Sequence, residues 1–211
     1  MSRYVGASCR LCRREGTKLF LKGTKCATEK CPVERRAYAP GQHGQTGGRV
    51  RKASEYAKQL REKQKVKRMY GLTEGQFRNT FADVTGEPGV KGTNLLVALE
   101  SRLDNIVYRM GFASSRKAAR QLITHGHIEV NGRRTDIPSY RVVPGQEVRV
   151  GRASRDLAAV RQAQEYASRG QPVSWISVDT DNAAGRLVER PTRDAIPINA
   201  QEQLIVELYS K

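Results

Sequence analysis

The strongest constraint on the fold is a change of hydrophobic period near the middle of the chain. Apolar side chains recur at helical spacing from Leu96 to Met110, and a second, shorter stretch of helical spacing follows. From His127 to Val150 they alternate instead, and Asn131-Gly132 is the strongest short hairpin signal in the chain. Two helices followed by three short strands predict a small α+β module over residues 94–152.

Capping signals and spacing predict further elements on both sides of this module. Thr73 with Gln76 is a capping-box start for one helix, and Ser114 or Ser115 is a suitable N-cap for another. We therefore expect helices over residues 53–69, from 73 onward, over 93–110, 115–123 and 154–167, and strands over 127–130, 140–143, 147–150, 173–178, 185–188 and 204–208.

Positive charge is concentrated in the first three quarters of the chain. The sequence has 38 Lys and Arg against 21 Asp and Glu, a formal net charge of +17, and only 6% aromatic residues. Residues 1–52 carry +10, residues 53–93 carry +3, residues 94–154 carry +5 and residues 155–211 carry −1. This graded excess indicates a polyanionic partner, and it favours nucleic acid over an anionic membrane surface.

The chain has no sequence signal for a membrane or for secretion. It contains no run of about 18 apolar residues. Its first residues, MSRYVGASCRLCRREG, lack the apolar stretch of a secretory signal. We expect a reducing compartment, the cytoplasm, in which disulfides do not persist.

All four cysteines lie near the start, as Cys9-x2-Cys12-x13-Cys26-x4-Cys31. Two close pairs separated by a loop are typical of one structural zinc ion held by four thiolates, which leave no open position for catalysis. An iron–sulfur cluster is the alternative metal centre, and two disulfides or four separate buried thiols are the alternatives without metal. Neighbouring cations are expected to lower the thiol pKa values. These cations are Arg10, Arg13, Arg14, Lys25 and Lys30.

The segment Arg35–Lys52, RRAYAPGQHGQTGGRVRK, has almost no aliphatic residues. It has too little apolar surface to fold alone, so it is predicted to be an extended arm, with a plain linker as the alternative. Basic side chains of this arm, of the following helix and of the helix–hairpin module are the candidate phosphate contacts. They are Arg49, Arg51, Lys52, Lys58, Arg61, Lys65, Lys67, Arg68, Arg116, Lys117, Arg120, Arg133 and Arg134. Tyr4, Tyr38 and Phe112 are candidates for base stacking, each equally suited to packing.

The helix–hairpin segment runs as SRLDNIVYRMGFA from Ser101, SSRKAARQL from Ser114 and HGHIEVNG from His125. It resembles the RNA-binding module named after small-subunit ribosomal protein four. Further motifs are the Cys-rich start, YAPGQHG from Tyr38, the helix Tyr56–Lys65, YGLTEGQFR from Tyr70 and the closing ELYSK. With these motifs, essentially the whole chain is similar to the bacterial family of that ribosomal protein. Because some members lack the cysteines, this chain resembles the zinc-bearing branch.

The resemblance implies a role in the ribosome. Members of the family are primary binders of the 5′ domain of 16S rRNA, nucleate assembly of the small-subunit body and contact ribosomal protein five of the small subunit. They also lie near the messenger entry channel, where mRNA is a further partner, and influence translational accuracy. The resemblance therefore implies these partners, a place in the cytoplasmic small subunit, and neither a membrane nor a small-molecule substrate.

These observations together predict an α+β protein. We expect an N-terminal zinc-knuckle arm, a helical subdomain and a small helix–hairpin RNA-binding module with short antiparallel strands. The expected segments are residues 1–48 for the knuckle and arm, 49–93 for the helical rRNA-binding subdomain, 94–152 for the module, and 153–211 for a C-terminal helix and short strands that pack on the preceding domains.

An RNA-modifying enzyme or a free-standing translational regulator with the same module is the competing interpretation. Arg102-Leu103-Asp104 superficially matches the motif around the nucleophilic Asp of pseudouridine synthases. It falls within an amphipathic helix, however, where Arg102 or Tyr108 is placed to pair with the carboxylate. The chain has no glycine-rich nucleotide loop, and only about sixty residues follow the module. We therefore expect a structural protein without catalysis.

Overall fold

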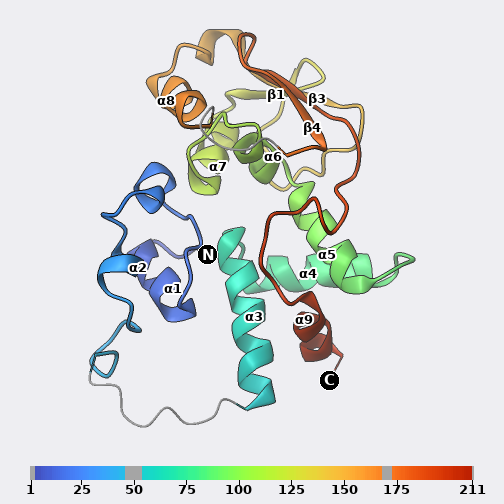
Figure 1. Cartoon of the computed structure of the whole chain (residues 1–211). Helices are drawn as coiled ribbons and strands as arrows, with labels where there is room; N and C mark the ends of the chain where they lie inside the picture. Colours follow the sequence, from blue (N-terminus) through green and yellow to red (C-terminus); the bar gives the residue numbers. More distant parts are fainter. Residues whose placement is uncertain (1–2, 46–53, 168–172, 211) are drawn as a thin grey trace. The chain divides into compact units, whose positions relative to one another are not determined.

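The computed structural model describes residues 3–45, 54–167 and 173–210. The chain divides into two compact units, one formed by residues 1–92 with 199–211 and the other by residues 93–198 (Figure 1). In sequence, the second unit is thus inserted between two parts of the first. This division differs from the four consecutive segments expected above, because long-range packing rather than local composition defines a unit. No helix of the described chain is long and apolar enough to cross a membrane.

The regular elements of the first unit are all helices among its described residues. Ser54 caps the long helix by accepting a hydrogen bond from the Ala57 amide, and Thr73 with Gln76 forms the predicted capping box. Its elements are α1 (Ser8–Glu15), the 3-10 turn η1 (Gly23–Ala27), α2 (Pro32–Arg35), α3 (Glu55–Met69), α4 (Glu74–Thr85) and α9 (Glu202–Tyr209).

The last element, α9, is a helix where a strand over residues 204–208 was expected, so that prediction is wrong. Ile205 is fully buried, and α9 lies beside α3 (Figure 1), where Gln59 Nε2 donates to Glu207 Oε2 at 2.9 Å. The Tyr209 ring stacks on the Phe81 ring of α4 with 4.6 Å between centroids. Packing on α3 and α4 therefore overrides the strand propensity of a short Leu-Ile-Val run.

The helix predicted to run unbroken to residue 110 is instead two helices, α5 (Lys91–Glu100) and α6 (Leu103–Arg109). A distant segment causes the break, because the Leu103 amide donates to the Tyr140 carbonyl and the Val142 amide donates to the Ser101 carbonyl, both at 2.8 Å. The expected strand over 140–143 is reduced by the same pairing to one isolated bridge, between Arg102 and Arg141.

The second unit contains helix α7 (Arg116–Thr124) and the strands β1 (Ile128–Val130), β2 (Arg133–Arg134), β3 (Glu147–Val150), β4 (Ile176–Asp179) and β5 (Ala184–Leu187). The strands form one five-stranded antiparallel sheet in the order β2-β1-β3-β5-β4, of which β1, β3 and β4 are labelled in Figure 1. Ser115 caps α7 as predicted, and the Asn131-Gly132 turn has the positive φ values, 47° and 76°, that a tight hairpin requires. The short antiparallel strands are thus confirmed. Because β4 and β5 lie within residues 155–211, the segment with a net charge of −1, much of that segment belongs to this unit.

One apolar core joins the helices of this unit to its sheet. Ile106 from α6, Ile128 from β1, Val148 from β3 and Trp175 beside β4 are all completely buried in it. The hairpin and α7 are therefore packed on this core.

The helix expected over residues 154–167 is shorter, with a 3-10 turn η2 (Arg152–Ser154) followed by α8 (Ala158–Ala167).

Candidate nucleic-acid interface

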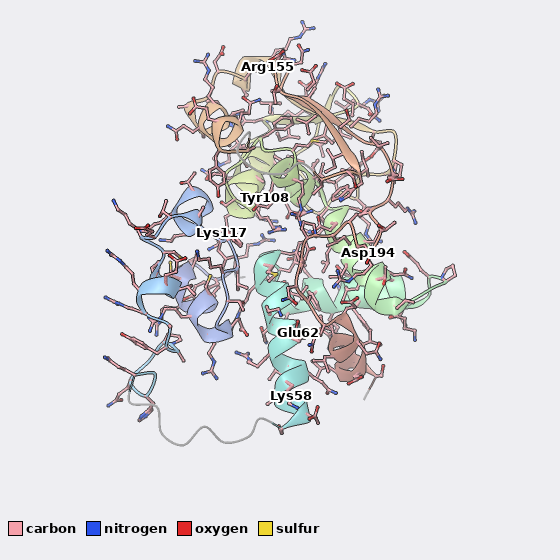
Figure 2. The ribbon with its side chains drawn as sticks, viewed as in Figure 1. Lys58, Glu62, Tyr108, Lys117, Arg155 and Asp194 are labelled. Carbon is pink, nitrogen blue, oxygen red and sulfur yellow. The ribbon has the colours of Figure 1, made fainter. Side chains whose placement is uncertain are left out.

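The basic helix α3 is already neutralised to a large extent by carboxylates of its own unit. Lys58 at its N-terminal end and Glu62 one turn further on are labelled in Figure 2. Each of the five candidate phosphate contacts on this helix has a carboxylate partner. Lys58 pairs with Glu55, Lys65 with Glu62 and Lys67 with Glu74, each at 2.7 Å, while Arg61 at 3.4 Å and Arg68 both pair with Glu15. The helix therefore offers a polyanion less net charge than its sequence indicates.

Glu74 is the centre of one such group. It accepts hydrogen bonds from Lys67 and from Lys63, whose side chain is only 8% exposed, and from the Tyr209 hydroxyl at 3.3 Å. Burial by itself raises the pKa of Glu74, but the hydrogen bonds from Lys63 and Lys67 outweigh it, so the pKa is lowered. Burial and the neighbouring Glu74 carboxylate raise the pKa of Tyr209, which keeps its phenol protonated and able to donate.

On α7, Arg116 belongs to an interior network. Its Nε donates to Asn105 Oδ1 at 2.7 Å, its guanidinium lies 4.6 Å from the centre of the Tyr108 ring, and one Nη lies 3.9 Å from buried Glu100. Glu100 also pairs with Arg109 at 2.7 Å. Since the Arg116 side chain is only 12% exposed, it holds α5, α6 and α7 together more than it faces solvent.

The other two candidates on α7 are placed differently. Arg120 lies 3.8 Å from Asp104 and is partly buried, whereas Lys117 lies on the exposed face of the helix. The three residues that sequence spacing assigns to one phosphate-binding face therefore differ in solvent exposure, and of the three only Lys117 is exposed.

The hairpin tip presents two exposed arginines, Arg133 and Arg134. Arg134 Nη2 donates to the His125 carbonyl at 3.4 Å, and a β-carbon at position 126 would collide with the Arg134 guanidinium. Gly126, at φ +76°, therefore allows that guanidinium to lie over the turn between α7 and β1. Neither arginine makes an ion pair within the described chain, so both keep their charge for a partner.

Among the described residues, exposed cations without an ion pair are most concentrated in residues 10–36, where no phosphate contact was assigned from the sequence. Two of the acids in this segment are occupied, Glu15 by α3 and Glu34 by Lys18. Seven exposed cations here make no ion pair with any described residue. They are Arg10, Arg14, Lys22, Lys25, Lys30, Arg35 and Arg36. The +10 net charge of residues 1–52 was the signal that pointed to them.

The remaining candidates divide between the arm and the aromatic residues. Arg49, Arg51 and Lys52 lie outside the described residues. Phe112 is completely buried, so its candidacy for base stacking is wrong. Tyr38 lies under Arg13, whose guanidinium is 4.6 Å from the ring centre and whose Nε donates to the Tyr38 carbonyl at 3.0 Å. This contact ties the start of the arm to α1.

The four cysteines are thiols, three of them buried (Cys12, Cys26 and Cys31) and Cys9 partly exposed. Burial raises the pKa of the Cys12 and Cys26 thiols, and the neighbouring cysteines raise both further. The expected lowering by nearby Arg and Lys is therefore wrong for these two, because desolvation dominates. Among the described residues, no group of three or more His, Cys, Asp or Glu side chains is arranged to hold a metal ion.

The carboxylate that resembles a catalytic nucleophile is held in a salt bridge. Asp104 is 3% exposed, and its two oxygens accept hydrogen bonds from Arg102 Nε at 3.1 Å and Nη2 at 2.8 Å. The predicted pairing with Arg102 is thus confirmed. A buried carboxylate with both oxygens occupied by a guanidinium is a structural group rather than an available nucleophile.

Comparisons with known proteins are consistent along the whole chain. Residues 3–100 match the family model of the ribosomal protein S4/S9 N-terminal domain, and residues 101–148 match that of the S4 domain. The chain is 53% identical to the small ribosomal subunit protein uS4 of Thermus thermophilus, 54% identical to that of Natranaerobius thermophilus and 53% identical to that of Acetivibrio thermocellus. In each case the match covers 100% of both chains.

Proposed function

The chain belongs to the family of the small ribosomal subunit protein uS4, and we propose from that premise that it is a structural constituent of the small ribosomal subunit that binds ribosomal RNA. The observation that carries the proposal is the agreement of two family models, in order along the chain, with full-length relatives of that name. The family is one of structural proteins, which agrees with the expectation that the chain has no catalytic activity.

A more specific role follows from the resemblance described at the outset. The protein binds the 5′ domain of 16S rRNA as a primary binder, nucleates assembly of the subunit body, contacts ribosomal protein five of the small subunit and influences translational accuracy near the messenger entry channel. The distribution of exposed cations supports RNA as the partner. Unpaired arginines and lysines are presented by residues 10–36 and by the hairpin tip, as backbone recognition of a folded RNA requires.

The test is the salt-dependent affinity of the pure protein for a 5′-domain rRNA fragment, compared with an unrelated RNA of equal length. We expect tighter binding to the fragment and an affinity that falls steeply with salt. Co-sedimentation with small subunits through a high-salt wash supports the ribosomal role, and loss at moderate salt favours a free-standing regulator. Conversion of uridine by the purified protein would establish an enzyme instead.

For the cysteines, the proposal is one zinc ion held by Cys9, Cys12, Cys26 and Cys31. The donor set supports it, since four thiols in two close pairs, three of them buried, suit tetrahedral zinc, and each pair is short enough in sequence to form one knuckle. A bound zinc would supply a structural cross-link between α1 and the segment before α2. The small apolar cluster of this region, formed by Cys12, Leu19 and Leu21, is too small to stabilise it alone.

The zinc proposal is tested by elemental analysis of the purified protein and by chelation. We expect one zinc per chain, and a chelator should unfold residues 1–35 selectively. Amide signals in the inserted unit, residues 93–198, serve as the internal control. Iron with visible absorbance would establish a cluster instead, and a metal-free protein whose spectrum a chelator leaves unchanged would refute both metals.

A further inference from the structure

We propose that Phe20 is a base-stacking residue that holds an unpaired nucleotide of the RNA, an inference that rests on the function proposed above. Phe20 is 45% exposed and has a φ of +50°. Among the described residues of the first 36, it is the aromatic side chain with the highest exposed fraction, slightly above Tyr4 at 43%. Neither its exposure nor its backbone is what packing alone would select.

The backbone of Phe20 is strained for its residue type. At positive φ the β-carbon crowds the neighbouring carbonyl oxygen, so glycine and asparagine are the residues usually found there. A turn with a purely structural role would be more stable with either of them. Strain of this kind, at an exposed position with little burial to offset it, is characteristic of residues retained for binding.

The ring is nevertheless held on a fixed support. Its neighbours Leu19 and Leu21 are 2% and 8% exposed and pack with Cys12 in one cluster, against which Leu11 and Met69 also lie. Two inward anchors on either side of Phe20 point its ring outward and restrict the backbone between them. An aromatic ring held in advance loses little conformational entropy when a base stacks on it.

The charge of the same segment supports RNA as the partner. Lys22 and Lys25 follow Phe20 closely in sequence, are exposed and make no ion pair with any described residue, while Lys18 is paired with Glu34. Cations beside an exposed aromatic ring can hold the phosphates of a strand whose base lies on the ring. Phenylalanine has no polar atom to read a base edge, so the site takes an unpaired nucleotide with little preference among bases.

The experiment compares two variants with the wild-type protein for binding to the 5′-domain rRNA fragment. Phe20→Asn suits positive φ but removes the ring. We expect it to be at least as stable to urea as the wild type, yet to bind about 5- to 150-fold more weakly, with an unchanged salt slope. Lys22→Ala is the matched phosphate control and should reduce the slope by about 0.7–0.9. Phe20→Trp should bind normally and show fluorescence quenching on RNA addition, with the wild type, whose Trp175 is buried, as background.

Each contrary outcome overturns the inference. If Phe20→Asn is less stable than the wild type, the ring has a packing role. If its RNA affinity is unchanged, or Phe20→Trp is not quenched, the ring does not meet a base, and loss of the Asn variant from small subunits would then indicate a protein neighbour. If wild-type binding to the fragment does not exceed binding to the control RNA, the proposed function itself fails. The wild-type measurements with the two RNAs thus distinguish failure of the Phe20 inference from failure of the proposed function.

Discussion

Glu74 accepts hydrogen bonds from two lysines on successive turns of α3 and from the phenol of Tyr209 on α9. At the scale of single residues, the role of a basic side chain depends on the carboxylates that the fold places next to it. Lys67 meets Glu74 and is largely neutralised, whereas Lys22 and Arg133 are exposed and make no ion pair with any described residue. Charge type is visible in the sequence, but pairing depends on contacts between residues that are far apart in it.

Replacement of Glu74 by Gln is predicted to give a pH-dependent loss of stability. Because the lysines lower the folded-state pKa of Glu74, its charge stabilises the fold above the unfolded-state pKa, and this stabilisation is lost as pH falls through the folded-state pKa. Glu74→Gln should therefore lower the free energy of unfolding by about 1 kcal/mol at pH 7 and by nothing in strong acid. Urea denaturation followed by circular dichroism at both pH values measures this.

The control is Glu55→Gln, which removes a single exposed pair with Lys58. Its effect at pH 7 should be smaller than that of Glu74→Gln. A Glu74→Gln deficit that grows in acid would contradict the assigned direction of the pKa shift.

At the scale of elements, helix α9 joins the end of the chain to a unit whose other residues lie in the first 92. The Gln201 amide donates to Glu62 Oε1 of α3 at 2.8 Å, and the fully buried Ile205 anchors the helix. The same scale explains the break between α5 and α6, which is set by backbone pairing with residues 140–142. Both features depend on partners outside any local window.

Truncation of Ile205 to Ala should destabilise the helical unit by about 3 kcal/mol, because a completely buried side chain is replaced by a cavity. Since Trp175 is buried in the inserted unit, its emission should keep the wild-type unfolding midpoint while the helical signal shifts to lower urea. Val188→Ala, at an exposed site, is the control and should change neither signal appreciably. A parallel shift of both signals would show that the two units unfold as one.

For the molecule as a whole, the net charge of +17 does not measure the charge that is presented. The acids of the helical unit neutralise much of α3, and Glu100 and Asp104 pair with arginines inside the inserted unit. In the described part of the chain, exposed cations without an ion pair are most concentrated in residues 10–36. Association with a polyanion should therefore depend more on that segment than on the longest basic helix.

This predicts different effects of two triple Ala variants on RNA binding. Simultaneous replacement of Lys22, Lys25 and Lys30 should lower the salt slope by about 2–2.7, since each releases counterions on binding. The matched variant lacks Lys58, Lys65 and Lys67, which are already paired, and should change the slope less. Titrations of the rRNA fragment at several salt concentrations measure both slopes. A larger effect in the α3 variant would show that its ion pairs open in the complex.

Features that depend on a few neighbouring residues could be predicted from the amino-acid sequence alone. These include the Thr73 and Ser115 caps, the Asn131-Gly132 hairpin turn and the antiparallel strands beside it, and its motifs predicted the family. Such signals are local because a cap or a turn is satisfied within about four residues.

Long-range packing, by contrast, establishes which cations are neutralised, that residues 202–209 form a helix, and that β4 and β5 complete the sheet. The reason is distance along the chain. The hydrogen bond between Gln59 and Glu207 joins residues 148 positions apart, and no periodicity within either segment contains information about the other.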